Sequence, residues 1–275
     1  MQNYINIILG AKGGIGKTVI TTYLAEYLQI KMKQTVTIID TDTNNSGLRQ
    51  YGFFATQFVD FKDETGAITS VSIQEIAEQF SKNNVIIDTG ANSYYAWFSY
   101  LKDMFGIEML SSSGAKVLIH VPLVPGQMKQ ETFNCLDEIV NANLGNDNCR
   151  PQIIVHLNNG FNSFGQGIRQ DKLPSPLDFS AKTEFAKYRG KVHYVVEEPR
   201  IPITMKFMYD SLRNQHIAIS ELADCSMEDL KKYQLTSPDG KENRQASIID
   251  KKSCQIIRNL IFMSYQNLDP LYNVK

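Results

Sequence analysis

A glycine-rich segment near the start of the chain, Gly10–Thr18 (GAKGGIGKT), constrains the fold more than any other feature. It follows the apolar run Tyr4–Leu9 and matches the pattern G-x-x-x-x-G-K-[ST]. Backbone N–H groups in such a turn, together with the start of a helix, form a concave site for phosphates. Apolar residues at helical spacing predict that helix over Val19–Lys31. The segment therefore predicts a strand, a phosphate-binding loop and a helix in succession.

The loop also predicts which groups would hold a nucleotide. Lys17 would reach the β- and γ-phosphates, and the Thr18 hydroxyl would bind Mg²⁺. Glycine-rich turns join strands to helices in other proteins too, but an extra lysine, Lys12, and acidic strand ends favour a nucleotide site. The expected nucleotide contacts in this loop are Gly13, Gly14, Ile15, Gly16, Lys17, Thr18 and Val19.

Two later strands are predicted to end in carboxylates. Thr35–Asp40 is a β-branched run that leads to Asp42, and Asn84–Asp88 is a second apolar run. Ligands of open α/β sheets bind beyond the carboxyl ends of the strands, so Asp40 and Asp42 would face the nucleotide. Asp88 would hold Mg²⁺, commonly through water molecules. Aspartates also serve as turn and capping residues, but after this loop the binding role is favoured.

Further strands and helices alternate along the chain. A segment without clear periodicity, Phe53–Ser70, is expected to be an irregular connection. The alternation predicts an α/β fold with a single doubly wound, mostly parallel sheet and helices on both faces. The additional strands are predicted over Lys116–Pro122, Gln152–Leu157 and Val192–Val196, and helices over Ser72–Ser81, Tyr94–Met109, Gln127–Val140, Ala181–Arg189, Ser211–Leu222 and Ser247–Tyr265.

The 275 residues are expected to form one domain, since this length suits a single large α/β core. Glycine and proline punctuate residues 161–191, which predicts an insertion, and residues 205–275 are expected to form a C-terminal helical segment. The formal net charge is −1, so any contact with DNA would need a local patch. No apolar run approaches a membrane span, and the N-terminal residues do not resemble a signal peptide. We therefore expect a cytoplasmic protein without membrane contact.

Several side chains on the later strands have two interpretations. The Asn158 amide follows a predicted strand and could read the edge of adenine, although Asn-Gly is also a common turn sequence. Pro199 follows the last predicted strand and could pack against the base. His120 and His156 lie within apolar strands and are expected to be hydrogen-bonded core residues rather than ligands. Trp97 is expected either in the core or on a surface that faces a partner.

The chain resembles the ParA/MinD family of deviant Walker A ATPases. The resemblance rests on Lys12 in AKGGIGKT, which is the additional lysine of the family pattern K-G-G-x-G-K-[ST], with Asp40, Asp42 and Asp88. A closer likeness is to the TraL-like branch of plasmid conjugal-transfer proteins, through VIIDTGANSY, VLIHVPLVPGQ, VHLN and VVEEP. This likeness covers most of the chain and is looser outside the ATP-binding motifs.

The resemblance implies an ATP- and Mg²⁺-dependent homodimer with a protein partner in plasmid transfer or partition. Lys12 would reach across to the phosphates bound by the other subunit, and Asp42 would position the attacking water. Asp40 would lie near the metal, Asp88 would be the Walker B carboxylate, and Asn158 matches the position that contacts adenine.

Two departures from the family leave the activity open. Thr43 stands where ParA proteins have proline, and Thr89-Gly90 replaces a small residue followed by proline. Both departures bear on the switch geometry and on the rate of hydrolysis. The first interpretation is a slow ATPase that dimerises on ATP, and the second is a nucleotide-gated binding module with little hydrolysis. A third, a P-loop enzyme acting on a small metabolite, would not need Lys12.

Overall fold

The structure is a computed structural model that describes residues 2–42, 48, 54–68, 73, 80, 82–158, 173–198, 259, 262–263 and 265–272. The predicted helix over 211–222 lies outside these residues, as do Thr43, Pro199, residues 161–172 of the predicted insertion and most of 205–275. Of the helix predicted over 72–81, positions 73 and 80 are described, and both are helical.

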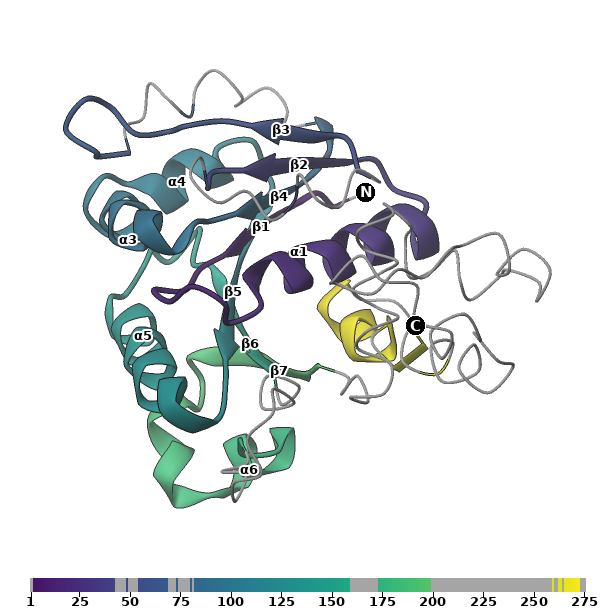
Figure 1. Cartoon of the computed structure of the whole chain (residues 1–275), viewed down its shortest axis with the longest axis vertical. Helices are drawn as coiled ribbons and strands as arrows, with labels where there is room; N and C mark the ends of the chain where they lie inside the picture. Colours follow the sequence, from purple (N-terminus) through teal and green to yellow (C-terminus); the bar gives the residue numbers. More distant parts are fainter. Residues whose placement is uncertain are drawn as a thin grey trace, which may run out of the picture.

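The core of the fold is a seven-stranded sheet with the order β3-β2-β4-β1-β5-β6-β7 (Figure 1). Every neighbouring pair is parallel, and β1 lies between β4 and β5 at the centre. The chain thus winds from the centre towards both edges, which confirms the predicted doubly wound α/β fold of P-loop proteins. The strands are β1 (Tyr4–Ile8), β2 (Val36–Asp40), β3 (Thr56–Phe58), β4 (Asn84–Asp88), β5 (Lys116–Leu123), β6 (Gln152–Leu157) and β7 (Val192–Glu197).

Helices cover both faces of this sheet, as predicted. One apolar cluster joins the sheet to α1, η1 and the C-terminal residues, and the other joins it to α3, α4, α5 and α6 (Figure 1). The α-helices are α1 (Lys17–Glu26), α3 (Tyr94–Asp103), α4 (Gly106–Ser111), α5 (Lys129–Asn141) and α6 (Pro176–Ala181). A π-helical turn, η1 (Tyr27–Lys31), continues α1, and the short 3₁₀ segments are η3 (Ala91–Ser93), η4 (Gly126–Met128), η6 (Thr183–Tyr188) and η7 (Asp269–Tyr272).

The edge strand β3 corrects the prediction that Phe53–Ser70 is wholly irregular. Its three residues pair in parallel with β2, beginning with Ile38 opposite Thr56. The sequence TQF has no apolar alternation, so pairing with the preformed β2 edge, rather than local propensity, makes it a strand.

The single helix predicted over Tyr94–Met109 is wrong, because the chain breaks it into α3 and α4. Phe105 lies between them with φ of 54°, in the left-handed region that interrupts a right-handed helix. Gly106 then passes close to Tyr100, so that a Cβ atom there would lie 2.6 Å from the Tyr100 ring. Trp97 on α3 is fully buried, which confirms its core interpretation.

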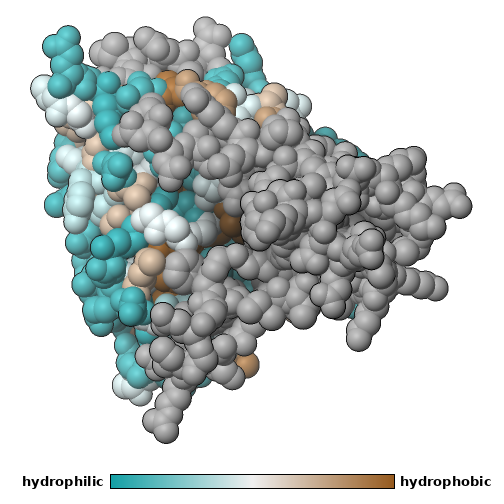
Figure 2. Space-filling view, viewed as in Figure 1, coloured by the Kyte–Doolittle hydropathy of each residue, from teal (hydrophilic) through white to brown (hydrophobic). Residues whose placement is uncertain are grey.

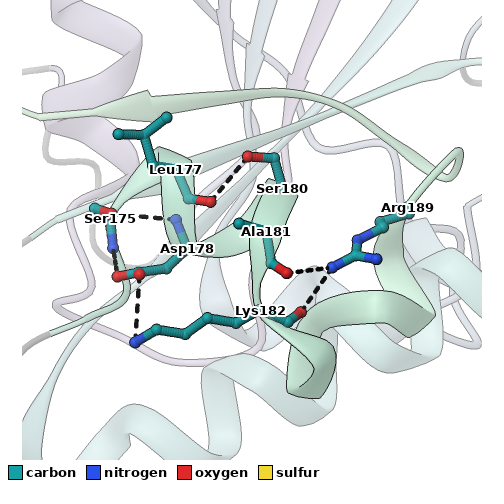
Figure 3. A network of polar contacts seen from close by, with 7 residues as sticks. All are labelled: Ser175, Leu177, Asp178, Ser180, Ala181, Lys182 and Arg189. Atoms are coloured by element: carbon teal, nitrogen blue, oxygen red, sulfur yellow. Dashed lines mark hydrogen bonds and ion pairs between the residues drawn. The ribbon is translucent and has the colours of Figure 1, made fainter.

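The short helix α6 is held at both ends by polar contacts (Figure 3). At its start, the Ser175 Oγ accepts from the Asp178 N–H at 3.2 Å, and the Asp178 carboxylate accepts from the Ser175 N–H at 2.9 Å. Beyond its end, Arg189 donates to the carbonyl oxygens of Ala181 and Lys182. These contacts pair backbone groups that a helix leaves without intrahelical partners. They hold α6 in place within the described part of the predicted insertion.

The described surface is mainly hydrophilic on the face drawn in Figure 2, with hydrophobic residues in small separate areas. No helix among the described residues is both long enough and apolar enough to cross a membrane.

A chain of buried polar side chains crosses the face of the sheet that carries α1. The imidazole of His120 on β5 lies 3.0 Å from the Asn6 Oδ1 on β1 and 2.8 Å from the imidazole of His156 on β6. His156 in turn lies 2.5 Å from the Glu198 carboxyl, just after β7. The Tyr272 hydroxyl donates to Asn6 Oδ1 at 2.7 Å. Both histidines are therefore hydrogen-bonded core residues, as predicted.

Hydrogen-bonding capacity fixes the direction of this chain. The Asn6 amide nitrogen donates to the Val85 carbonyl, so Asn6 Oδ1 accepts, and His120 must present Nε2–H to it. Burial, with His156 nearby, keeps the pKa of His120 well below its ordinary value, so its Nδ1 is an acceptor for His156 Nε2–H. His156 Nδ1 then ends the chain in its contact with the Glu198 carboxyl. The buried side chains of this chain are thus paired with one another.

Candidate nucleotide-binding site

The predicted strand, loop and helix are present at the centre of the sheet. β1 ends at Ile8 and α1 begins at Lys17, with the glycine-rich loop between them. Gly14 and Gly16 have φ values of 73° and 96°, which glycine adopts without strain. The loop therefore needs glycine at these two positions to turn from the strand into the helix.

Lys17 is buried beneath the loop. Its ammonium group donates to the Lys12 carbonyl oxygen at 2.8 Å. Burial lowers the pKa of Lys17, while Asp88 and Asp42 act in the opposite direction. In this poorly hydrated site an ammonium group would attract a phosphate strongly.

Asp40 and Asp88 are neighbours at the ends of β2 and β4, where they occupy paired positions in the parallel register. Both are 2% exposed. They lie on the face that α1 covers, two residues beyond Ile38 and Ile86 of the same apolar cluster. The predicted acidic residues therefore meet next to Lys17, at the carboxyl edge of the sheet.

The Thr18 side chain, on the first turn of α1, hydrogen-bonds to Asp88. Burial and the nearby Asp40 raise the pKa of the Asp88 carboxyl to about 7. A divalent cation would relieve this unfavourable burial of two carboxylates, and hydroxyl and carboxylate oxygens are suitable ligands for Mg²⁺. The predicted set of Thr18, Asp40 and Asp88 therefore fits Mg²⁺.

Among the described residues, no group of three or more His, Cys, Asp or Glu side chains is arranged to hold a metal.

Asp42 lies beside the loop that follows β4. Its backbone N–H donates to the Asp40 carboxylate at 2.9 Å. A Cβ atom on Gly90 would lie 2.8 Å from the Asp42 Cγ, so only glycine permits this approach. Gly90 thus allows the loop after β4 to pack against the Asp42 side chain.

Three side chains whose contacts the sequence analysis did not predict hold this acidic edge in place. The Thr41 hydroxyl donates to the Asp88 carbonyl at 3.1 Å and accepts from the Trp97 indole N–H at 3.3 Å. The Thr89 hydroxyl donates to the Ile8 carbonyl at 2.6 Å. A buried threonine directly after each acidic strand end is the sequence signal that could have indicated these contacts.

Lys12 extends from the exposed side of the loop. Its ammonium group lies 3.0 Å from the Glu131 carboxylate on α5, and both side chains are about half exposed, at 46% and 47%. The Lys12 ammonium group is therefore held by an exposed ion pair, which it can leave at little cost.

The predicted base-contacting residues are placed only in part. Asn158 directly follows β6, and its amide donates to the Ile15 carbonyl of the loop at 3.2 Å. Pro199 lies outside the described residues.

Two further predicted nucleotide contacts belong to the glycine-rich segment. Gly13 is exposed in the loop, and Val19 is half-buried in the first turn of α1.

We expect Asp88→Asn to stabilise the protein when both nucleotide and Mg²⁺ are absent. Because the folded pKa of Asp88 is raised to about 7, the folded chain retains a proton that the unfolded chain releases above about pH 4. The stability of the wild type should therefore fall as pH rises from about 4 to about 7. Asparagine has no charge to bury, so the variant's advantage should be small near pH 4 and reach several degrees in melting temperature above pH 7.

Thermal unfolding across this pH range measures the effect. Asp103→Asn, at a half-exposed carboxylate on α3, is the matched control and should change little. A difference between Asp88→Asn and wild type that stays constant with pH would contradict the buried-charge explanation.

Comparison with known sequences finds relatives but no family model that matches the chain. Two TraL proteins of Escherichia coli are 29% and 27% identical over 132 residues, which is 47% of this chain. These residues make up 54% of each TraL protein, so the match spans about half the length of these curated relatives.

Among solved structures, the MinD cell division protein of Aquifex aeolicus aligns over 97% of both chains. The TM-score is 0.44 and the identity 15%, so we draw nothing about function from this likeness. The parallel sheet and the loop geometry of the chain itself carry the assignment of the fold. The chain is similar to the TraL proteins over about half of its length and, as its sequence predicted, resembles the ParA/MinD-type P-loop ATPases.

Proposed function

We propose that the chain is a Mg²⁺-dependent ATPase that dimerises on binding ATP and switches a partner protein in plasmid conjugal transfer or partition. The observation that carries this proposal is the convergence of Lys17, Thr18, Asp88 and Asp42 at the carboxyl edge of the sheet, below a loop that bears a second lysine. Similarity to TraL proteins supports the setting in plasmid transfer, and hence the cytoplasm as the location.

The proposed reaction is hydrolysis of ATP to ADP and phosphate. Water would attack the γ-phosphorus, and the bond to the β,γ-bridging oxygen would break. Lys17 would neutralise charge that develops on the phosphate oxygens, and Asp42 would orient the water. Thr18, Asp88 and Asp40 would hold Mg²⁺, which would supply further positive charge beside the phosphates.

Lys12 would complete the site across a dimer. An exposed ion pair such as the one with Glu131 contributes no more than about 1 kcal/mol. Phosphate groups presented by a second copy of the chain would carry more negative charge than one glutamate. We therefore infer that Lys12 exchanges Glu131 for the partner's nucleotide when ATP is bound.

We expect the solution mass to double with Mg·ATP, but not with Mg·ADP or without nucleotide. Lys12→Ala should prevent this doubling while the monomer stays folded, because the exposed side chain contributes little to stability. Light scattering after size-exclusion chromatography measures both effects, with the exposed Lys116→Ala as control. A mass that does not respond to nucleotide, or a Lys12→Ala protein that dimerises as wild type does, would exclude the proposed switch.

The second candidate function is a nucleotide-gated binding module with little hydrolysis. It is favoured by Thr89-Gly90 in place of the family's proline motif, and by the packing of Gly90 against Asp42. Phosphate release from Mg·ATP, compared between wild type and Asp42→Asn, separates the two functions. Release that depends on Asp42 supports the ATPase, whereas binding of Mg·ATP without release supports the gated module.

A further inference from the structure

Asn158 connects the end of β6 to the phosphate-binding loop. Its backbone N–H donates to the Leu123 carbonyl at 2.9 Å, which continues the pairing of β6 with β5. Its side-chain amide donates to the Ile15 carbonyl at 3.2 Å. The residue is thus fixed to the sheet through its backbone and to the loop through its side chain.

The contact determines how one peptide group of the loop is oriented. The Ile15 carbonyl and the Gly16 N–H belong to the same peptide, and the described chain contains no cis peptide bond. In a planar trans peptide the carbonyl and the N–H point in opposite directions. Since Asn158 draws the carbonyl towards itself, the Gly16 N–H must point away from Asn158. If this peptide were rotated, the Ile15 carbonyl oxygen, which repels anions, would instead occupy the side to which the Gly16 N–H points.

Gly16 is suited to this arrangement. It precedes α1 with φ of 96°, and a Cβ atom there would lie 2.5 Å from the Asn158 amide nitrogen. Glycine therefore serves both the backbone conformation and the close approach of the amide. N–H groups at this point, directly before a helix, are those that bind phosphate in a glycine-rich loop.

The position of Asn158 is itself supported from within the sheet. His156, two residues earlier on β6, hydrogen-bonds to His120 and Glu198, and the Glu198 N–H donates to the Leu157 carbonyl at 3.1 Å. β6 is thus held to the strands on both sides immediately before Asn158 leaves the sheet.

We propose that Asn158 is a positioning residue of the phosphate-binding loop, which orients the Gly16 N–H towards the bound phosphates and does not read the base. The proposal relies on the proposed function only for the identity of the nucleotide. It replaces the adenine contact expected from the family resemblance with a role in binding the triphosphate itself.

Binding of Mg·ATP and of inorganic tripolyphosphate, which has no base, tests the proposal. Asn158→Ala should weaken both ligands by the same factor, roughly fivefold, as expected for one neutral hydrogen bond. Asn158→Asp should weaken both further, because a carboxylate cannot donate to Ile15 and would repel the phosphates. Asn148→Ala, at an exposed asparagine on the opposite edge of the sheet, should change neither. Weakened ATP binding with unchanged tripolyphosphate binding would overturn the proposal in favour of a base contact.

A second measurement needs no ligand. In ¹⁵N- and ¹³C-labelled protein, Asn158→Ala should shift the Ile15 carbonyl and Gly16 amide resonances, because the carbonyl loses its donor. If the wild type binds neither ligand, the proposed function fails, and these resonances still decide whether Asn158 orients the peptide. Resonances unchanged from wild type would overturn the proposal.

Discussion

Lys17→Ala is expected to weaken Mg·ATP binding by about 100-fold or more and to remove hydrolysis. Lys17 is 8% exposed, and its ammonium group lies among Asp88, Asp42 and the loop carbonyl of Lys12. Without the Lys17 ammonium group, a bound triphosphate would lie near these carboxylates in a poorly hydrated site, with one cation fewer to offset the negative charge. Two charge-assisted hydrogen bonds to phosphate, at about 1.5 kcal/mol or more each, account for this factor.

Titration calorimetry with Mg·ATP measures the loss of affinity. Lys116→Ala, which removes an exposed lysine at the start of β5, is the control. Thermal unfolding should show that Lys17→Ala remains folded, because burial of the charge is itself unfavourable and lowers the pKa of Lys17. Binding within about threefold of the wild type would show that the loop is not the phosphate site, since even one charged hydrogen bond exceeds that factor.

Tyr272→Ala is expected to lower the free energy of unfolding by about 3–5 kcal/mol, the range for truncation of a buried aromatic side chain. The Tyr272 ring packs edge-on against Tyr4 at 5.0 Å and lies 5.4 Å from Tyr27, measured between ring centroids. Burial raises the pKa of Tyr272 well above its ordinary value, so the hydroxyl stays protonated and donates to Asn6. Alanine would remove the packing and the hydrogen bond together.

Tyr272→Phe separates these two contributions. Phenylalanine keeps the ring contacts and loses only the hydrogen bond, at a cost of about 1 kcal/mol, because His120 still donates to Asn6. Denaturant unfolding of the two variants gives both values. Equal losses would mean that the hydroxyl matters more than the packing, and a loss below about 1 kcal/mol for Tyr272→Ala would show that the C-terminal residues do not cover the sheet in solution.

Local sequence patterns predicted most of the sheet. The apolar β-branched runs at β1, β2, β4, β5 and β6 are buried strands, because a parallel sheet covered on both faces favours such residues throughout, and the run at β7 forms a partly exposed edge strand. The edge strand β3 (TQF) has no apolar β-branched run. It is a strand because its backbone pairs with β2, and this pairing cannot be seen in the local sequence. The break at Phe105 was missed because apolar residues continue across it, and the glycine that follows was the one local indication.

The candidate site could be predicted where the motif itself fixes the geometry. Lys17, Thr18 and the paired carboxylates of Asp40 and Asp88 depend only on the loop and on parallel register. The partners of His120 could not be predicted, because they depend on the order β1-β5-β6-β7, which places residues far apart in sequence on one face. The role of Asn158 depends equally on that order, since β6 must lie near the loop for its amide to reach Ile15.

The central position of β1 has a consequence for how the chain folds. Ile5 pairs with Val85, and Tyr4 pairs with Lys116, so β1 gains neighbours only when distant parts of the chain return to it. Non-local pairing of this kind slows folding and leaves an apolar strand unpaired in partly folded chains. The end of β1 and the loop after it are held by hydrogen bonds from the ends of β4, β5 and β6, through Thr89, His120 and Asn158. We therefore expect this loop to reach its shape late in folding, so that a chain that has not finished assembling its sheet would lack the formed candidate site.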